Sequence, residues 1–410
     1  MKRLIVFYFA SLLIFSCSQE HKLTDFEYSS KVDTSDHPIT PQEKKVYNID
    51  GVSADNMFDA AHMYNFSKLD EGHFQVDVRP ENAPINMSPW YAFRLYADKE
   101  QSIKVTLDYD ENGRHRYWPK LSADGEQWNF MDSTRFVVGA DSASFTMELE
   151  IGPDTLWVSA QEIISSSDMK EWTASLSSEY VTNTVIGKSR LGKDLLHVDI
   201  TKGDKADKDF FVVLSRQHPP EVTGNMAMMA YVEELLGGSE LAEEFLDQYR
   251  VLVYPMLNPD GVDLGHWRHN EGGIDLNRDW AYYRQPEVRQ ICEDIIAKVN
   301  ETGNEVVLGM DFHSTWEDIY YIYDDTVKST IQGFSREWIE NIFDRLPEDE
   351  GIISPFAVNS PVSKNWFYSQ FKAEGITYEI GDATPRDLIK KKGQVGAQEM
   401  MKLLLGKYKD

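Results

Sequence analysis

Two histidines and one glutamate in this sequence have the types and the spacing of a catalytic zinc site. His218 and Glu221 lie three residues apart in His-Pro-Pro-Glu, and His313 lies in a separate segment much later in the chain. Catalytic zinc sites use three protein ligands, often two histidines and a glutamate, and leave the fourth position for water. A single His-x-x-Glu pair is common on protein surfaces, so this interpretation depends on whether the fold brings the three residues together.

The segments around these residues predict an α/β sheet with helices on both faces. Apolar runs typical of buried strands cover residues 210–215, 250–257, 306–312 and 376–380. Helical patterns lie between and after them, near residues 223–237, 286–300, 331–346 and 387–407. Strands that alternate with helices in this way are typical of α/β domains.

Polar side chains follow the predicted strands at the points where these strands end. His218 and Glu221 come after 210–215, His313 and Ser314 come after 306–312, and Glu379 lies at the end of 376–380. In open α/β sheets, sites form beyond the carboxyl ends of the strands. We therefore expect the three candidate zinc ligands and Glu379 to share one rim of the sheet.

The first half of the chain has a different pattern, which predicts a separate β-sandwich. Short runs of alternating apolar and polar residues, such as HFQVDVRP and SIKVTLDYDENG, are separated by turn signals and by no long helical period. We expect an antiparallel β-sandwich over residues 46–172 and a catalytic domain over residues 173–410.

The N-terminus predicts a secretory signal of the bacterial lipoprotein type. Met-Lys-Arg precedes a short apolar run, and Cys17 follows a small residue at the end of residues 1–17. An ordinary signal peptide with an accidental cysteine is the alternative. A lipid on Cys17 would anchor the protein in the cell envelope, at the periplasmic or surface face of the outer membrane. Residues 18–45 are polar and predict a flexible tether, and Cys292 predicts buried packing within a helix.

The charge of the chain excludes two classes of partner. The formal net charge is −27 over 410 residues, which argues against nucleic acids and anionic membrane faces as partners, since both require basic patches. Contact with a membrane is therefore expected only through the lipid anchor.

Four motifs in one order resemble the zinc metallocarboxypeptidases. They are His218-x-x-Glu221, Asp275-Leu-Asn277-Arg278, His313-Ser314 and the late Glu379. The longer string NPDGVDLGHWRHNEGGIDLNRDW, together with SPWYAFRL and LSADGEQW, is more similar to the cytosolic-carboxypeptidase branch and its bacterial relatives. The resemblance covers nearly all of residues 46–400, and it implies a mixed-sheet catalytic domain preceded by a β-domain.

The resemblance also implies a role for each matching residue. His218, Glu221 and His313 would hold one zinc ion per chain, and Asp275 would orient the ring of His218. Glu379 would be the general base, and Arg268 would stabilise the oxyanion. The residues implied to contact the substrate are Asn277, Arg278 and Ser314, the first two through its C-terminal carboxylate.

Two basic residues are candidates for selecting the substrate's C-terminal side chain. The family's specificity residue lies before the catalytic glutamate, where Lys364 is the basic residue best placed by count. A lysine there would favour acidic C-terminal residues. Arg386 could serve the same purpose, and Lys364 could instead be an ordinary solvated lysine. Digestive members of the family carry a tyrosine about two dozen residues before that glutamate, whereas residues 341–367 contain no tyrosine.

Three functions remain open at this point. The first is a carboxypeptidase that acts on the C-termini of peptides or proteins. The second is a zinc amidase or deacylase, which would act on peptidoglycan peptides or N-acyl amino acids. The third is a non-catalytic binding protein, which the retained ligands and Glu379 disfavour. The Asn277-Arg278 pair favours recognition of a free carboxylate, and therefore the first function.

Overall fold

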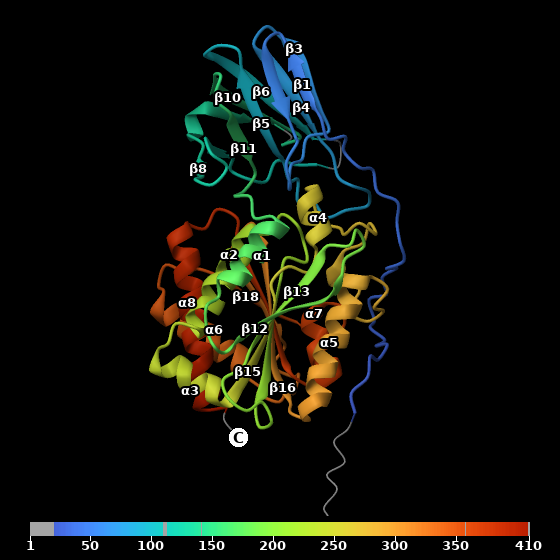
Figure 1. Ribbon diagram of the computed structural model, residues 1–410, viewed down its shortest axis with the longest axis vertical. Coiled ribbons are helices and arrows are strands. Elements are labelled where there is room, and N and C mark those ends of the chain that lie inside the picture. The colour runs from blue at the N-terminus through green and yellow to red at the C-terminus, as the bar shows by residue number, and fades with distance from the viewer. Residues whose placement is uncertain (1–19, 110–112, 141, 357, 409–410) are drawn as a thin grey trace, which may run out of the picture.

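The protein consists of a unit of β-strands stacked on one end of a larger α/β unit (Figure 1). The computed structural model describes residues 20–109, 113–140, 142–356 and 358–408. The predicted signal and its Cys17 lie outside these residues. In the part of the chain that is described, no helix combines the length and the apolar character that crossing a membrane requires.

Two sheets pack face to face in the N-terminal unit. The first sheet has the order β1 (Val46–Ile49), β2 (Val52–Asp55), β5 (Ala92–Ala97), β11 (Leu156–Ser159), β7 (Lys120–Ser122), β8 (Asn129–Phe130). The second has the order β3 (Asn65–Asp70), β4 (His73–Val78), β6 (Gln101–Tyr109), β10 (Ser144–Ile151), β9 (Phe136–Val138). The short helix η1 (Ser133–Arg135) precedes β9. Alternate residues of each strand are buried between the sheets, as in Phe74, Val76 and Val78 of β4. The pairs are antiparallel except β4 with β6, which run parallel.

A mixed sheet of eight strands forms the centre of the α/β unit. Its order is β12 (Val181–Lys188), β13 (Asp194–Ile200), β15 (Tyr249–Tyr254), β14 (Asp209–Ser215), β16 (Val306–Thr315), β19 (Glu374–Gly381), β17 (Ile319–Tyr323), β18 (Ile352–Phe356). The four central strands β15, β14, β16 and β19 are parallel to one another, so their carboxyl ends lie at one edge. These strands are almost entirely buried, as expected for a parallel sheet covered on both faces.

Helices cover both faces of this sheet (Figure 1). One face packs against α2 (Val222–Leu235), α3 (Glu240–Gln248), α6 (Phe334–Arg345) and α8 (Arg386–Leu405). The other packs against α5 (Pro286–Thr302) and α7 (Ser363–Phe371). A Cβ at Gly224 of α2 would lie 2.1 Å from the carbonyl oxygen of His313, so glycine is required for α2 to approach β16 this closely.

The boundary between the units differs from the expected one. Helix α1 (Ser166–Ser175) packs through Met169 and Trp172 into the core of the α/β unit, and it contacts α4 (Pro259–Leu264). A boundary at 172/173 would cut this helix. The helix follows directly after the alternating pattern of the β-strands, so the sequence analysis included its first residues in the β-sandwich. The α/β unit therefore starts at or before Ser165, whose side chain caps α1.

Residues 20–45, which we call the strap, lie along the α/β unit in place of a free tether (Figure 1). Tyr28 is buried, with its hydroxyl 3.0 Å from Ser369 Oγ. Thr34 is fully buried and donates to Asp279 Oδ1 at 2.6 Å. Leu23 and Phe26 also pack against the core of the α/β unit. These few apolar residues follow no helical or strand period, so the sequence does not predict that the strap is ordered.

Candidate metal centre and active site

The candidate zinc ligands lie at the carboxyl ends of two neighbouring strands. His218 and Glu221 follow β14, and His313 belongs to β16, which pairs with β14 in parallel. On the other side of β16, His313 is directly opposite Glu379 of β19. The parallel register therefore brings together all four residues that the sequence placed on one rim.

The three candidate ligands converge on one point. His218 Nδ1 lies 2.7 Å from one carboxylate oxygen of Glu221, and His313 Nδ1 lies 2.6 Å from the other. The two Nδ1 atoms are 3.2 Å apart. Each of the three residues is at most 4% exposed. Together they form a buried group of potential metal-binding atoms that all lie within 4.8 Å of one another.

The outer ring nitrogens show why this group fits a cation. His218 Nε2 lies 2.8 Å from Asp275 Oδ1, and His313 Nε2 lies 2.8 Å from Asp311 Oδ2. A carboxylate only accepts hydrogen bonds, so each Nε2 carries a proton. Each Nδ1 also faces a carboxylate, that of Glu221, so a positive charge, either a second proton or a bound cation, lies between them. A bound cation would use both Nδ1 lone pairs and the carboxylate together. Zn–N bonds of 2.0–2.1 Å place tetrahedral neighbours ~3.3 Å apart, close to the Nδ1–Nδ1 separation.

Asp311 is a functional residue that the sequence analysis missed. It is fully buried, and its Oδ2 also accepts hydrogen bonds from Gln217 Nε2 at 2.5 Å and from Ser363 Oγ. It holds His313 as Asp275 holds His218. A signal was present, because Asp311 and His313 are two residues apart on one strand and therefore share a face.

Asp275 connects the metal centre to both arginines of its loop. Its Oδ2 accepts from Arg268 Nε at 2.8 Å and lies 3.7 Å from Arg278 Nη1. Its Oδ1 caps the short helix η2 (Leu276–Arg278) through the backbone N–H of Asn277. Burial would raise the pKa of Asp275, but Arg268, His218 and Arg278 hold this pKa well below its ordinary value. The residue therefore stays an anion that can fix its partners.

The two arginines differ in their access to solvent. The side chain of Arg268 is 10% exposed, whereas that of Arg278 is 38% exposed. Arg278 donates from Nη1 to the carbonyl oxygen of Asn277 at 2.8 Å. The turn between the arginines depends on Gly273, whose φ is +71° and where a Cβ would lie 2.4 Å from the carbonyl oxygen of His37.

Two predicted substrate contacts are placed differently from the expectation. The hydroxyl oxygen of Ser314 accepts from Gly224 N at 2.8 Å and from Thr223 Oγ1 at 2.9 Å, so it supports the start of α2 instead of facing a substrate. Asn277 Oδ1 accepts from Ser363 N at 2.9 Å, and its Nδ2 lies 3.4 Å from His313 Nε2. Only the Nδ2 group of Asn277 remains available for a carboxylate.

Glu379 is an ionisable group without a hydrogen-bond partner among the described residues. Its Oε2 is buried and makes no hydrogen bond. Burial, and next the negative charge of Glu221, raise the pKa of Glu379 to about 7. A cation between the candidate ligands would offset the contribution of Glu221.

The candidate specificity residues also have clear positions. Lys364 is fully buried, so the interpretation of a solvated lysine is wrong. Arg386 donates to both carboxylate oxygens of Glu162, at 2.7 and 2.6 Å, and to Gln161 Oε1 at 2.7 Å. Arg386 therefore joins the two units and does not line a substrate pocket.

Comparison with known proteins agrees with this geometry. Residues 168–384 match the zinc carboxypeptidase family, Peptidase_M14. The chain belongs to this family. Its α/β unit thus has the zinc carboxypeptidase fold, and the candidate ligands lie within the matched residues. Cytosolic carboxypeptidase 3 of Bos taurus is 20% identical over 309 residues, which cover 67% of this chain and 30% of that protein. Cytosolic carboxypeptidase 6 of Caenorhabditis elegans is 26% identical over 164 residues, which cover 38% of this chain and 36% of that protein.

Solved structures extend the similarity to the β-strand unit. A metallo-carboxypeptidase from Burkholderia cenocepacia has a TM-score of 0.73 at 18% identity. The match covers 86% of the present chain and 98% of the Burkholderia chain. One from Pseudomonas aeruginosa has a TM-score of 0.71 at 18% identity with the same coverage. These matches show the fold, including the preceding β-unit. The chain spans only about a third of the length of the cytosolic carboxypeptidases it matches.

Proposed function

We propose that this protein is a zinc-dependent carboxypeptidase that removes C-terminal residues from peptides or proteins. The observation that carries the proposal is the inward-facing Nδ1 pair of His218 and His313 with Glu221 between them, directly opposite the unpartnered carboxylate of Glu379. One zinc ion held by these three ligands would supply Lewis-acid activation of the attacking water and of the scissile carbonyl.

The residues around the ligands supply the remaining steps of peptide hydrolysis. Glu379 takes a proton from the attacking water and later gives it to the leaving amine, because its buried carboxylate makes no hydrogen bond from Oε2 and it lies directly opposite His313 in the sheet. Arg268 stabilises the oxyanion, because its Nε is held by Asp275 and its two terminal NH2 groups make no hydrogen bond within the described contacts. Arg278 and the Nδ2 group of Asn277 bind the substrate's C-terminal carboxylate.

The proposal is tested with peptides that differ only at their C-terminus. We expect amidation of the C-terminus to lower kcat/KM by about 10²-fold or more, because charge-assisted hydrogen bonds to Arg278 and Asn277 are lost. Mass spectrometry of the products identifies which bond is cut, and metal analysis counts zinc per chain. Equal cleavage of the acid and the amide would instead support a zinc amidase or deacylase.

The position of Lys364 supports a preference for acidic C-terminal residues. Its Nζ lies 3.8 Å from the centroid of the Tyr323 ring and 4.0 Å from that of Phe356, and it donates to the carbonyl oxygen of Ile322 at 3.5 Å. Burial holds the pKa of Lys364 well below its ordinary value, although Glu374 acts to raise it. A carboxylate that entered beside Nζ would restore the charge of the ammonium group.

Lys364 packs against the face of β19 that also carries Glu379. Gly375, Thr377 and Glu379 share this face, because side chains alternate along a strand. A Cβ at Gly375 would lie 3.0 Å from Lys364 Cγ, so Lys364 lies at the far end of this row from Glu379. We propose that an acidic side chain of the substrate enters on this face, where Lys364 would be its charged partner.

The Lys364→Met variant tests this preference. We expect the wild-type enzyme to favour peptides that end in Glu over those that end in Leu, and the variant to lose about 10²-fold of this preference, because a buried charge pair is removed. The measurement is the ratio of kcat/KM for matched peptides. A wild-type preference for Leu or Phe would overturn the acidic-pocket proposal and leave the carboxypeptidase proposal standing.

A lipid on Cys17 would orient the enzyme on a bacterial envelope membrane. The strap begins beside the C-terminal end of α5, where His21 N donates to Asn300 Oδ1 at 2.8 Å. That end lies away from the β-unit, at the amino ends of the central strands (Figure 1). The proposed anchor would thus hold this end toward the bilayer and the rim with the zinc ligands away from it.

A further inference from the structure

The loop that carries Arg268 is held by a carboxylate from the other unit of the protein. Glu81 follows β4 of the β-unit and is 1% exposed. Its Oε2 accepts from the backbone N–H of Trp267 at 2.8 Å. Its Oε1 accepts from the backbone N–H of Arg268 at 3.0 Å and of His269 at 2.6 Å. One side chain thereby fixes three successive peptide units around the arginine.

The residue after Glu81 holds the same loop. Asn82 Oδ1 lies 2.6 Å from His269 Nδ1, and Asn82 Nδ2 donates to the carbonyl oxygen of Gly273 at 3.0 Å. Between the end of α4 and the start of η2, this loop has no helix or strand of its own. Its backbone N–H groups would otherwise be buried without partners, which is unfavourable. The Glu81–Asn82 pair therefore fixes a segment that its own sequence does not make rigid.

Glu81 carries a negative charge that suits this purpose. Burial acts to raise the pKa of Glu81, but His266, His269 and the backbone amides hold it below its ordinary value. The ionised form has acceptor sites on both oxygens and no proton to place, so it can accept all three N–H groups at once. Charge-assisted hydrogen bonds of this kind are stronger than neutral ones.

We propose that Glu81 is a positioning residue for catalysis, which sets the place of the Arg268 guanidinium from the β-unit. The proposal rests on the proposed role of Arg268 at the oxyanion. Arg268 is held at two points, its backbone by Glu81 and its Nε by Asp275. With both points fixed, the terminal NH2 groups keep one direction. Displacement of a catalytic group by about 1 Å can cost about 10²-fold in rate.

This role gives the β-unit a part in the reaction through its contact with the loop that carries Arg268. The oxyanion is fully formed only in the transition state. A displaced guanidinium therefore destabilises the transition state more than it weakens the binding of the substrate. Loss of Glu81 should therefore lower kcat and leave the binding of the substrate carboxylate, which uses Arg278 and Asn277, nearly unchanged. A residue that merely stabilised the fold would not separate these two quantities.

The test uses the full chain with its zinc and the variant Glu81→Gln. Glutamine keeps one acceptor oxygen and replaces the other by an NH2 group that cannot accept from Trp267. We expect kcat to fall about 10- to 100-fold, with KM within about 2-fold of wild type. Binding of a phosphonate transition-state analogue should weaken by the same factor as kcat, whereas binding of a simple product-like carboxylate should not change.

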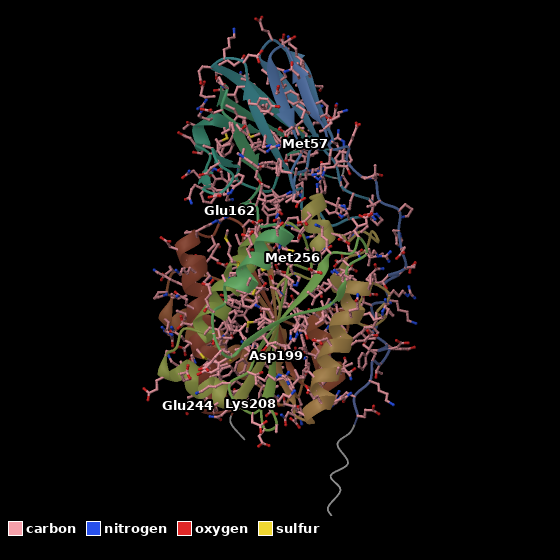
Figure 2. All side chains as sticks on the ribbon, viewed as in Figure 1. Met57, Glu162, Asp199, Lys208, Glu244 and Met256 are labelled. Carbon is pink, nitrogen blue, oxygen red and sulfur yellow. The ribbon has the colours of Figure 1, made fainter. Side chains whose placement is uncertain are left out.

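The matched control is Glu162→Gln. Glu162 also lies at the junction of the two units, where Figure 2 labels it, and its carboxylate binds Arg386 and not the Arg268 loop. We expect this variant to keep wild-type kcat and analogue affinity. Equal loss of kcat in both variants would show that any weakened junction impairs the enzyme, and it would overturn the specific role of Glu81.

A double mutant separates this inference from the proposed function. In an Arg268→Ala background, Glu81→Gln should lower kcat no further, because the group that it positions is absent. An Arg268→Ala enzyme with wild-type kcat overturns the role of Arg268 itself. An impaired Arg268→Ala enzyme beside an unimpaired Glu81→Gln enzyme overturns only the positioning proposal. If Glu81→Gln does not fold, Glu81→Asp keeps the charge but shortens the side chain, so that its carboxylate cannot reach all three N–H groups, and it carries the same expectations.

Discussion

Glu379→Gln is expected to lower kcat by about 10²- to 10⁴-fold while the protein keeps one zinc ion per chain. Glutamine has nearly the same shape but cannot take a proton from water or give one to the leaving amine. The carboxylate of Glu379 makes no hydrogen bond from Oε2, so the substitution breaks no described contact of that atom. The measurements are kcat on a peptide with a free C-terminus and zinc content by elemental analysis.

The control for this prediction is Glu399→Gln. Glu399 is a buried glutamate on α8 that pairs with Arg345 and Lys402, remote from the candidate ligands. The Glu399→Gln variant should retain wild-type kcat. A Glu379→Gln enzyme that remained fully active would exclude Glu379 as the general base. If the variant were inactive but contained no zinc, the loss of activity would be explained by the missing metal and not by the missing base.

Arg268→Ala is expected to lower kcat by about 10²- to 10³-fold with a small change in KM, as for loss of one oxyanion donor. Arg278→Ala should instead raise KM by about 10- to 100-fold for substrates with a free carboxylate, because a charge-assisted contact in the ground state is lost. The structural basis is their different setting: Arg268 is enclosed beside Asp275, whereas Arg278 is open to solvent. Steady-state kinetics of both variants on one peptide measures the two effects.

Removal of Arg268 also leaves Asp275 with one partner fewer, so zinc content must be checked in the same samples. Arg268→Lys is the useful companion, because it keeps the charge but cannot reproduce the planar guanidinium geometry. Changes in kcat and KM of equal size from both arginine substitutions would contradict this division of roles.

The central strands and the ligand set were predictable because two simple rules apply to them. Buried parallel strands are continuous apolar runs, so β14, β16 and β19 each begin and end within a few residues of the expected positions. Parallel strands end at one edge, which placed His218, Glu221, His313 and Glu379 together. The strands β12, β17 and β18 at the borders of the sheet are more polar or shorter and gave no such signal.

The supporting contacts were harder to predict for a different reason. Asp311 could have been found from the alternation of the strand, since it shares a face with His313. Glu81 could not, because its three hydrogen bonds join residues 186 to 188 positions apart and no local pattern marks either side. The strap was taken for a tether because a segment held by hydrogen bonds has the same polar composition as a solvated one.

The contacts made by the strap and by Glu81 also bear on the order in which parts of the protein fold. Thr34 meets Asp279 across 245 residues of sequence, and Glu81 meets His269 across 188. Such distant contacts form late, because much of the chain must be ordered before their ends can meet. Each unit has its own hydrophobic cluster, but the cluster of the β-unit also contains Val222 and Trp267 of the α/β unit. We therefore expect the loop that bears Arg268 to reach its final shape only when the two units dock, after most of the sheets have formed.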